Sequence, residues 1–267
     1  MQLRKFRIKL GKINHIFISH IHGDHVFGIF GLLSSFSLLG RSSRLHIYGP
    51  DMLEDLILDH MKYFQGELTY PLTFHTIRTD RSAMVYQDKK VTVHSIPLKH
   101  RVPACGFLIR EKPGQKNIKK EVINKYSISV RDIVRIKEGQ DYQTAEGQII
   151  SNDELTLPAC RPRSYAYCSD TAYSEEIIDQ IRGVDLLYHE TTFLHEDEKL
   201  AMETTHSTSC QAAGIARKAG AVKLLIGHFS SRYKNLDLFE QEARTVFEES
   251  YAVNDGDVFD VAQQREE

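Results

Sequence analysis

Three histidines and one aspartate fall within six consecutive positions, His20-Ile21-His22-Gly23-Asp24-His25. The preceding residues 13–19 are rich in β-branched and aromatic side chains and are predicted to form a short buried strand. Because alternate residues of an extended chain point the same way, His20 and His22 can hold one metal ion together. Asp24 and His25 follow a glycine turn and are predicted to face a second ion.

The ligand types in this cluster indicate the metal and its chemistry. Imidazole and carboxylate groups without thiolates suit zinc, and a catalytic zinc site keeps one position open for water. These ligand types alone do not separate zinc from manganese or iron. A group of ordinary polar surface residues is the alternative interpretation, but so many ligands directly after a buried strand argue against it. The cluster therefore predicts a two-metal hydrolase site.

The pattern HxHxDH after a buried strand resembles the signature of the metallo-β-lactamase superfamily. Three further candidate ligands come in the expected order, each at the end of a predicted strand: His100, Asp170 and His228. The resemblance implies two zinc ions per subunit, the first held by His20, His22 and His100 and the second by Asp24, His25 and His228. It also implies that Asp170 bridges the two ions.

Two later motifs narrow the resemblance to the tRNase Z family, endonucleases that trim the 3′ trailer from precursor tRNA. These motifs are His189-Glu190-Thr191-Thr192-Phe193 and His206-Ser207-Thr208. The resemblance implies that His206 lies close to the scissile phosphate and that Glu190 orients it. Asp24 is predicted to accept the proton of the attacking water. The implied products are a tRNA with a 3′-hydroxyl and a trailer with a 5′-phosphate.

Residues 111–163 interrupt the pattern of the rest of the chain. Between positions 110 and 137 nine basic residues face three acidic ones, a charge of +6. We therefore predict a single domain over residues 1–267 with 111–163 inserted, and the resemblance implies a flexible arm that serves as a tRNA-binding exosite. The basic residues predicted to contact RNA are Lys116, Lys119, Lys120, Lys125, Arg131, Arg135 and Lys137.

The elements that must position these residues alternate between strands and helices. Further strands are predicted at 44–48, 73–77, 84–87, 91–97, 106–110, 164–169, 184–189, 223–227, 251–253 and 258–261. Helices are predicted at 25–39, 52–63, 171–181, 207–219 and 235–250. This order predicts an α/β fold with helices flanking mixed sheets. The resemblance specifies a metallo-β-lactamase fold, an αββα sandwich of two mixed β-sheets with a protruding basic arm.

Members of the tRNase Z family normally start about fifty residues earlier, with two strands, a Gly-rich loop and a basic loop. We therefore expect this chain to lack the N-terminal strands of the fold. Losing edge strands would expose a sheet edge and part of the core.

The composition limits the classes of partner and the cellular location that we expect. The formal net charge is −2, so a nucleic acid would be bound by a local patch and not by the molecule as a whole. Four cysteines without CxxC spacing are expected to be free thiols. No apolar run approaches the ~20 residues that cross a bilayer, and no signal peptide is visible. We expect a cytoplasmic protein with no membrane partner and no nucleotide cofactor. The resemblance adds precursor tRNA as substrate and a homodimer.

Two alternatives remain at this point. One is another hydrolase of the same fold, such as a general phosphodiesterase, a thioester hydrolase or a lactamase. The other is a non-catalytic RNA-binding relative. The motifs around Glu190 and His206 argue against the first, and the presence of all seven metal positions argues against the second.

Overall fold

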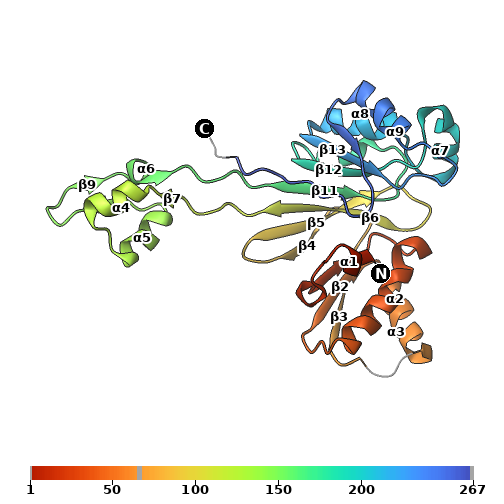
Figure 1. Cartoon of the computed structure of the whole chain (residues 1–267), viewed down its shortest axis with the longest axis horizontal. Coiled ribbons are helices and arrows are strands. Elements are labelled where there is room, and N and C mark those ends of the chain that lie inside the picture. The colour runs from red at the N-terminus through yellow and green to blue at the C-terminus, as the bar shows by residue number, and fades with distance from the viewer. Residues whose placement is uncertain (1, 65–67, 265–267) are drawn as a thin grey trace. The chain divides into compact units, whose positions relative to one another are not determined.

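The chain divides into two compact units, which are described separately. A computed structural model describes residues 2–64 and 68–264. The core unit comprises Met1–Asp88, Thr92–Ile109 and Ser164–Phe259, and the arm unit comprises Lys89–Val91, Arg110–Arg163 and Asp260–Glu267. Figure 1 labels the elements of both units. Within the described ranges, no helix is long and apolar enough to span a bilayer.

Two sheets lie at the centre of the core unit (Figure 1). The smaller has three parallel strands in sequence order, β1 (His15–Phe17), β2 (Leu45–Gly49) and β3 (Leu72–Thr76). The larger is mixed, with the order β14-β13-β12-β11-β6-β5-β4. Its strands are β4 (Met84–Gln87), β5 (Val91–Leu98), β6 (Ala104–Glu111), β11 (Ser164–Cys168), β12 (Leu186–Glu190), β13 (Lys223–Gly227) and β14 (Ser250–Ala252). Strands β11 to β14 are parallel, whereas β4 and β5 are antiparallel.

Helices cover the outer faces of both sheets. The main helices are α2 (Gly23–Leu38), α3 (Met52–Phe64), α8 (Ser209–Ala219) and α9 (Asp237–Val246). Shorter helices are α1 (Gln2–Lys5), η1 (Leu10–Lys12), η2 (Glu175–Ile177), η3 (His195–Asp197) and α7 (Glu198–Thr204). Buried side chains of α2 and α3 pack against β2, and buried side chains of α8 and α9 pack against the larger sheet.

The layering follows from the alternation of side chains along each strand. In β6, Ala104 and Leu108 join the apolar cluster under α8 and α9. Their neighbours Cys105 and Phe107 join a different cluster, which also contains Tyr48 of the smaller sheet. The larger sheet is therefore apolar on both faces, one against helices and one against the other sheet. This αββα arrangement confirms the predicted fold.

Most predicted elements are present, but two predictions are wrong. Residues 171–181 do not form a helix, apart from the single turn of η2. Backbone amides in this segment bond elsewhere: Thr171 donates to the Glu190 carboxylate at 3.1 Å and Ala172 donates to the Lys99 carbonyl at 2.7 Å. Residues 258–261 are not a strand, because they pair with no neighbouring strand in the described part of the chain.

The arm unit has a small apolar core of its own. Its elements are β7 (Asn117–Ile118), α4 (Lys120–Tyr126), α5 (Val130–Lys137), β8 (Tyr142–Gln143), β9 (Ile149–Ile150), α6 (Asn152–Leu155) and β10 (Thr156–Leu157). Strand β7 pairs with β10 and β8 with β9, both antiparallel. Ile118, Ile128, Ile136, Ile150 and Leu155 are buried together. Short elements around one cluster explain why the apolar periodicity of this segment is weak.

Candidate metal centre

Four candidate ligands come from the junction between β1 and α2. His20 and His22 precede the helix, whereas Asp24 and His25 lie in its first turn. The negative charge of Asp24 suits this position, because helix N-termini favour anions. A Cβ atom at Gly23 would lie 2.4 Å from the ring of the exposed Phe27, so a larger residue there would require that ring to move.

Strand ends of the larger sheet supply the other candidates. Asp170 follows β11, Glu190 ends β12, and His228 follows β13. These three strands are parallel neighbours, so their carboxyl ends meet at one edge of the sheet. His228 adopts a φ of +66°, a conformation that costs a non-glycine residue energy. His100 follows β5 in the same unit.

Asp170 lies between two groups of histidines. Its Oδ2 atom is 3.6 Å from His20 Nε2 and 3.7 Å from His100 Nε2. Its Oδ1 atom is 3.3 Å from His25 Nε2 and 3.4 Å from His228 Nε2. Each carboxylate oxygen therefore faces a different group, which is the geometry that a bridging carboxylate needs.

The structure brings all seven predicted ligands together. Candidate ligand atoms of His20, His22, His100 and Asp170 lie within 4.8 Å of one another, and so do those of Asp24, His25 and His228. A third set of this kind joins Asp170, His206 and His228.

Two buried nitrogen atoms support the fit of metal ions to these groups. His20 Nε2 and His25 Nε2 are buried without a hydrogen-bond partner. Leaving a buried polar atom unsatisfied costs free energy, and one ion in each ligand group would satisfy these two atoms. The donor set of imidazoles and carboxylates is suited to zinc.

Hydrogen bonds on the far side of the rings orient the histidines. His100 Nδ1 lies 3.0 Å from the carbonyl oxygen of Thr205. A carbonyl only accepts, so Nδ1 carries the proton and Nε2, which lies 3.1 Å from His22 Nδ1, keeps its lone pair. His20 Nδ1 lies 3.0 Å from Ser19 Oγ. Contacts of this kind select the tautomer that binds metal.

Metal binding needs neutral imidazoles and ionised carboxylates, and the pKa shifts of His20 and Asp170 favour these states, whereas that of His25 does not. Burial, together with the neighbouring His25, lowers the pKa of His20 to about 4. Burial opposes ionisation of Asp170, but His25 and His228 outweigh it and hold the pKa of Asp170 below its usual range. Burial lowers the pKa of His25, but the Asp170 carboxylate raises it by more.

Glu190 is fully buried beside this centre, and its carboxylate is surrounded by donors. Its Oε1 atom accepts from the backbone N–H groups of Thr171 and Ser207, both at 3.1 Å, and lies 2.8 Å from His206 Nδ1. Its Oε2 atom accepts from the N–H and the hydroxyl of Thr192, both at 2.9 Å. Glu190 is therefore held rigidly, and it leaves Nε2 as the atom of His206 that can face a substrate.

The local backbone also fixes His206. The residue before it, Thr205, ends α7 with a φ of +58°. Two residues after it, Thr208 caps α8 by accepting from the backbone N–H of Gln211, in a complete capping box. The Glu190 carboxylate opposes the effect of burial and raises the pKa of His206.

Thr192 belongs to the motif at 189–193, and its hydroxyl makes contacts that the sequence does not predict. Its hydroxyl donates to Glu190 and lies 2.9 Å from His228 Nδ1 and 3.1 Å from His206 Nδ1. Because the hydroxyl hydrogen is used on Glu190, the oxygen can accept from His228 Nδ1. Thr192 therefore links the carboxylate to both histidines, a role that chain order alone does not reveal.

The seven predicted RNA-binding cations of the arm differ in whether they already contact another residue of the chain. Lys116 pairs with Asp153 at 2.5 Å, Lys119 donates to the Glu154 carbonyl at 2.7 Å, and Arg135 donates to Gln140 at 2.8 Å. Lys125 lies over the ring of Tyr126. The remaining three form no ion pair with the described acidic residues and are exposed or half-buried: Lys120, Arg131 and Lys137.

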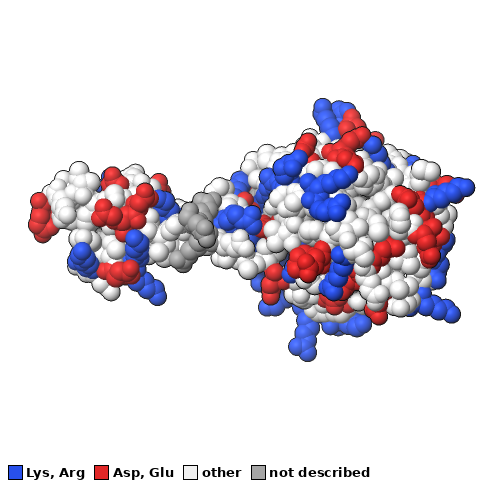
Figure 2. Space-filling view, turned by 90° about the horizontal axis from the view of Figure 1, so that it is seen from above, with Lys and Arg blue, Asp and Glu red and all other residues white. Residues whose placement is uncertain are grey.

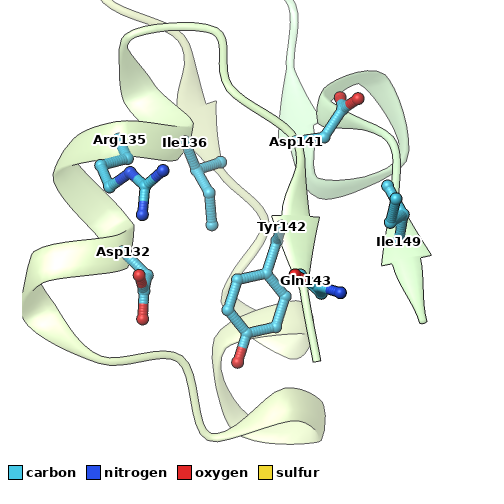
Figure 3. A pocket seen from close by; sticks show the side chains of 7 residues that line it. All are labelled: Asp132, Arg135, Ile136, Asp141, Tyr142, Gln143 and Ile149. Atoms are coloured by element: carbon cyan, nitrogen blue, oxygen red, sulfur yellow. The ribbon is translucent and has the colours of Figure 1, made fainter. Parts of the chain in front are cut away.

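The arm is also less basic as a whole than its first half. Residues 110–163 contain eleven basic and eight acidic residues, a charge of +3. Figure 2 shows both signs interspersed on the arm, at the left of the view. A pocket of about 430 Å³ lies between α5 and the β8–β9 hairpin, where Arg135 and Tyr142 share the lining with Asp132 and Asp141 (Figure 3). Two carboxylates make this pocket unsuited to a phosphate.

Comparisons with known proteins agree with the fold and show the family. The family model described as a beta-lactamase superfamily domain matches residues 2–118. A ribonuclease Z of Bacteroides fragilis is 49% identical over 247 residues, which cover 92% of this chain and 81% of that protein. A ribonuclease Z of Porphyromonas gingivalis is 46% identical over 254 residues, covering 95% and 84%.

Solved structures give the same result for the fold. The crystal structure of the short form of human tRNase Z has a TM-score of 0.67 and 24% identity, covering 97% of this chain and 83% of that one. The metallo-β-lactamase fold protein YhfI of Bacillus subtilis has a TM-score of 0.62 and 18% identity, covering 94% and 79%. At these identities the structures support the fold alone.

Proposed function

This chain belongs to the ribonuclease Z family, and from that premise we propose that it uses two zinc ions to remove the 3′ trailer from precursor tRNA. Membership makes it a metal-dependent endoribonuclease with the metallo-β-lactamase fold. The proposed products are a tRNA ending in a 3′-hydroxyl and a trailer beginning with a 5′-phosphate. The observation that supports this most is the position of Asp170 between two ligand groups, with the Glu190–His206 pair beside them.

We assign the first ion to His20, His22 and His100, the second to Asp24, His25 and His228, and the bridging position to Asp170. When bound, two zinc ions would stabilise charge on the phosphate and lower the pKa of water. The remaining steps belong to side chains of the chain itself.

Asp24 is the proposed acceptor of the proton from the attacking water. Its side chain is 69% exposed, so substrate water can reach it. Its Oδ2 atom also lies 3.4 Å from His25 Nε2 and 3.7 Å from His228 Nε2, at the edge of the second ligand group. The water oxygen forms the new bond to phosphorus as the proton passes to the Asp24 carboxylate.

His206 is the proposed donor of a proton to the leaving 3′-oxygen. The ring of His206 lies 5.1 Å from that of His100 and 5.4 Å from that of His228, centroid to centroid. With Nδ1 bonded to Glu190, the proton on Nε2 can pass to the oxygen as the P–O3′ bond breaks. A carboxylate that orients and supports an acid–base histidine is a common arrangement in catalysis.

The arm, residues 111–163, is proposed as an exosite for the body of the tRNA. Lys120, Arg131 and Lys137 support this role, because they are not committed to acidic partners in the described structure. Contacts from such cations to phosphates add affinity without reading sequence. A homodimer and a cytoplasmic location rest on the resemblance to the family, and sedimentation of the purified chain measures the former.

One experiment tests the proposed function. Purified protein is analysed for bound metal and incubated with a precursor tRNA that carries a 3′ trailer, with and without a chelator. We expect about two zinc ions per chain, a single cut at the trailer boundary with the stated ends, and loss of cleavage with the chelator. Hydrolysis of small phosphodiesters without cleavage of the precursor would favour a general phosphodiesterase. Tight tRNA binding without any cleavage would favour a non-catalytic relative.

A further inference from the structure

The core unit also contains a pocket, which lies directly beside His206. Its volume is about 430 Å³, which falls in the range of roughly 300–1,000 Å³ for pockets that hold small ligands. Ala172 and Tyr173, which follow Asp170, form part of the lining. Met202 of α7 and His206 form another part. The pocket therefore adjoins the group that we place at the leaving oxygen.

Tyr173 is held in place at this pocket. Its hydroxyl donates to Glu175 at 2.6 Å and accepts from Lys218 Nζ at 3.1 Å. Lys218 Nζ also lies 5.9 Å from the centroid of the Tyr173 ring. An aromatic ring fixed at its outer end needs no ordering when a ligand arrives, which lowers the entropic cost of binding.

Met202 adds an apolar, polarisable group to the same lining. It is 69% exposed although it is apolar, and nothing in the fold requires a methionine there. Aromatic rings and thioethers both make favourable contacts with flat π-systems. These two residues are suited to the face of a nucleobase.

The polar residues of the pocket match the rest of a nucleotide. Glu198 and Gln211 line it, and Gln211 Nε2 donates to Glu198 at 2.9 Å, so their remaining polar atoms can meet the edge of a base. The exposed Lys199 lies in the same lining and can contact a phosphate. A pocket for phosphate alone would not place a carboxylate and a methionine in its wall.

We propose that this pocket receives the base of the nucleotide that carries the leaving 3′-oxygen, the last nucleotide retained by the tRNA. The inference rests on the proposed function, which places His206 at that oxygen. The nucleotide attached to the oxygen must then lie on the side of His206, where the pocket is. Stacking is tolerant of sequence, so the pocket requires a base but does not select one strongly.

The test compares Met202→Ala with Met52→Ala, which changes a methionine of α3 that is 62% exposed and lies outside the pocket. Both variants are assayed on three precursor tRNAs: the intact one, one that is abasic at the last tRNA nucleotide, and one that is abasic at the first trailer nucleotide. Bis(p-nitrophenyl) phosphate reports the metal centre alone. Exposed methionines are chosen because their replacement leaves the core intact.

On intact precursor, Met202→Ala is expected to lower kcat/KM by about 5- to 10-fold, the lower part of the range for removal of one stacking partner of a base. The loss should vanish on the substrate abasic at the last tRNA nucleotide and persist on the one abasic in the trailer. Met52→Ala and small-phosphodiester hydrolysis should not change. Tyr173→Phe, which keeps the ring, should retain more activity than Tyr173→Leu.

Four results would overturn the proposal. Unchanged cleavage by Met202→Ala, or an equal loss on bis(p-nitrophenyl) phosphate, would mean that the pocket holds no base. A loss that vanishes only on the trailer-abasic substrate would place the other nucleotide there. If the wild-type protein does not cut the precursor at all, the proposed function fails together with this inference. In the other cases the wild-type protein does cut the precursor, so only this inference fails.

Discussion

The metal centre of the core unit and the charged surface of the arm unit use polar groups in opposite ways. At the centre, Glu190 and Asp170 are buried, Glu190 is held by specific hydrogen bonds, and each Asp170 oxygen faces specific histidines. On the arm, cations and carboxylates alternate on short helices and hairpins, and some of the cations are already paired. The activity of the centre should therefore depend on the position of each atom, whereas tRNA binding by the arm should depend on the summed electrostatic field of several exposed charges.

This comparison predicts very different sensitivities to mutation. Removing one member of a buried polar network leaves the other members unsatisfied, which is costly. Removing one exposed cation changes little, because water and salt screen it. Variants of the two regions should therefore differ in activity by orders of magnitude, from the largest effect at Asp170 to the smallest within the arm.

Asp170→Ala is expected to have the largest effect. Without this carboxylate, each ligand group loses one oxygen, so zinc content should fall and precursor cleavage should drop on the order of a thousandfold or more. Metal analysis and single-turnover kinetics measure the two quantities. Asp179→Ala is the matched control, because Asp179 is an exposed aspartate of the same unit. Retention of two metal ions by Asp170→Ala would contradict the bridging assignment.

His206→Ala should reduce kcat by about 10²–10⁴-fold while zinc content stays near the wild-type value. Glu190→Gln should act through the same histidine, so the double variant should be hardly worse than His206→Ala alone. His195→Ala, which changes an exposed histidine, serves as the control. If His206→Ala loses metal, His206 is a ligand and our assignment of its role is wrong; Asp170, His206 and His228 do lie close enough for that outcome.

Replacing Lys120, Arg131 and Lys137 with glutamine should weaken binding of precursor tRNA by about tenfold at moderate salt. The slope of log Kd against log salt should flatten by about one unit for each phosphate that is no longer neutralised. Hydrolysis of a small phosphodiester should not change. The control replaces Lys9, Lys12 and Arg217, which are exposed cations of the core unit. Equal losses on both substrates would mean that the arm is not an exosite.

The smallest effect is expected at the ion pair of Glu111 and Arg163 within the arm unit. Two hydrogen bonds from the Arg163 guanidinium, at 2.7 and 3.0 Å, lower the pKa of Glu111 to about 2. A lowered carboxyl pKa means that the pair stabilises the folded arm at neutral pH and that this contribution is lost as the pH falls from about 4.5 toward 2. The pair is about one-third exposed, so the effect should be modest.

Hydrogen exchange of arm amides between pH 5 and pH 3 measures this dependence after correction for intrinsic rates. Glu111→Gln should remove it, and Glu146→Gln, which changes another acidic residue of the arm, should leave it unchanged. A protection profile that is identical in the wild type and Glu111→Gln would contradict the role of the pair.

Parts of the fold that depend on local pattern are predictable from the sequence. The strands expected at 84–87 and 223–227 match the structure at both ends, because their alternation and flanking residues are local signals. The helix expected at 171–181 is replaced by the single turn η2 and local turns, and its first residues, Thr171 and Ala172, bond to residues far away in the sequence. Helix α7, which lines the pocket beside His206, is not predicted, because seven residues give little periodicity.

The sequence by itself determined which residue types stand at strand ends and that the cluster at His20 to His25 has the residue types of metal ligands, whereas the glycine expected to form a turn there is the first residue of α2. Only the tertiary structure decided that the two oxygens of Asp170 face different groups of histidines, that Thr192 joins Glu190 to both His206 and His228, and that a pocket opens beside His206. The physical reason is the sequence separation over which each kind of interaction acts. Turns, caps and alternation depend on neighbours in the chain, whereas distances of 3–4 Å between residues far apart in sequence depend on how the packed sheets bring the strand ends together.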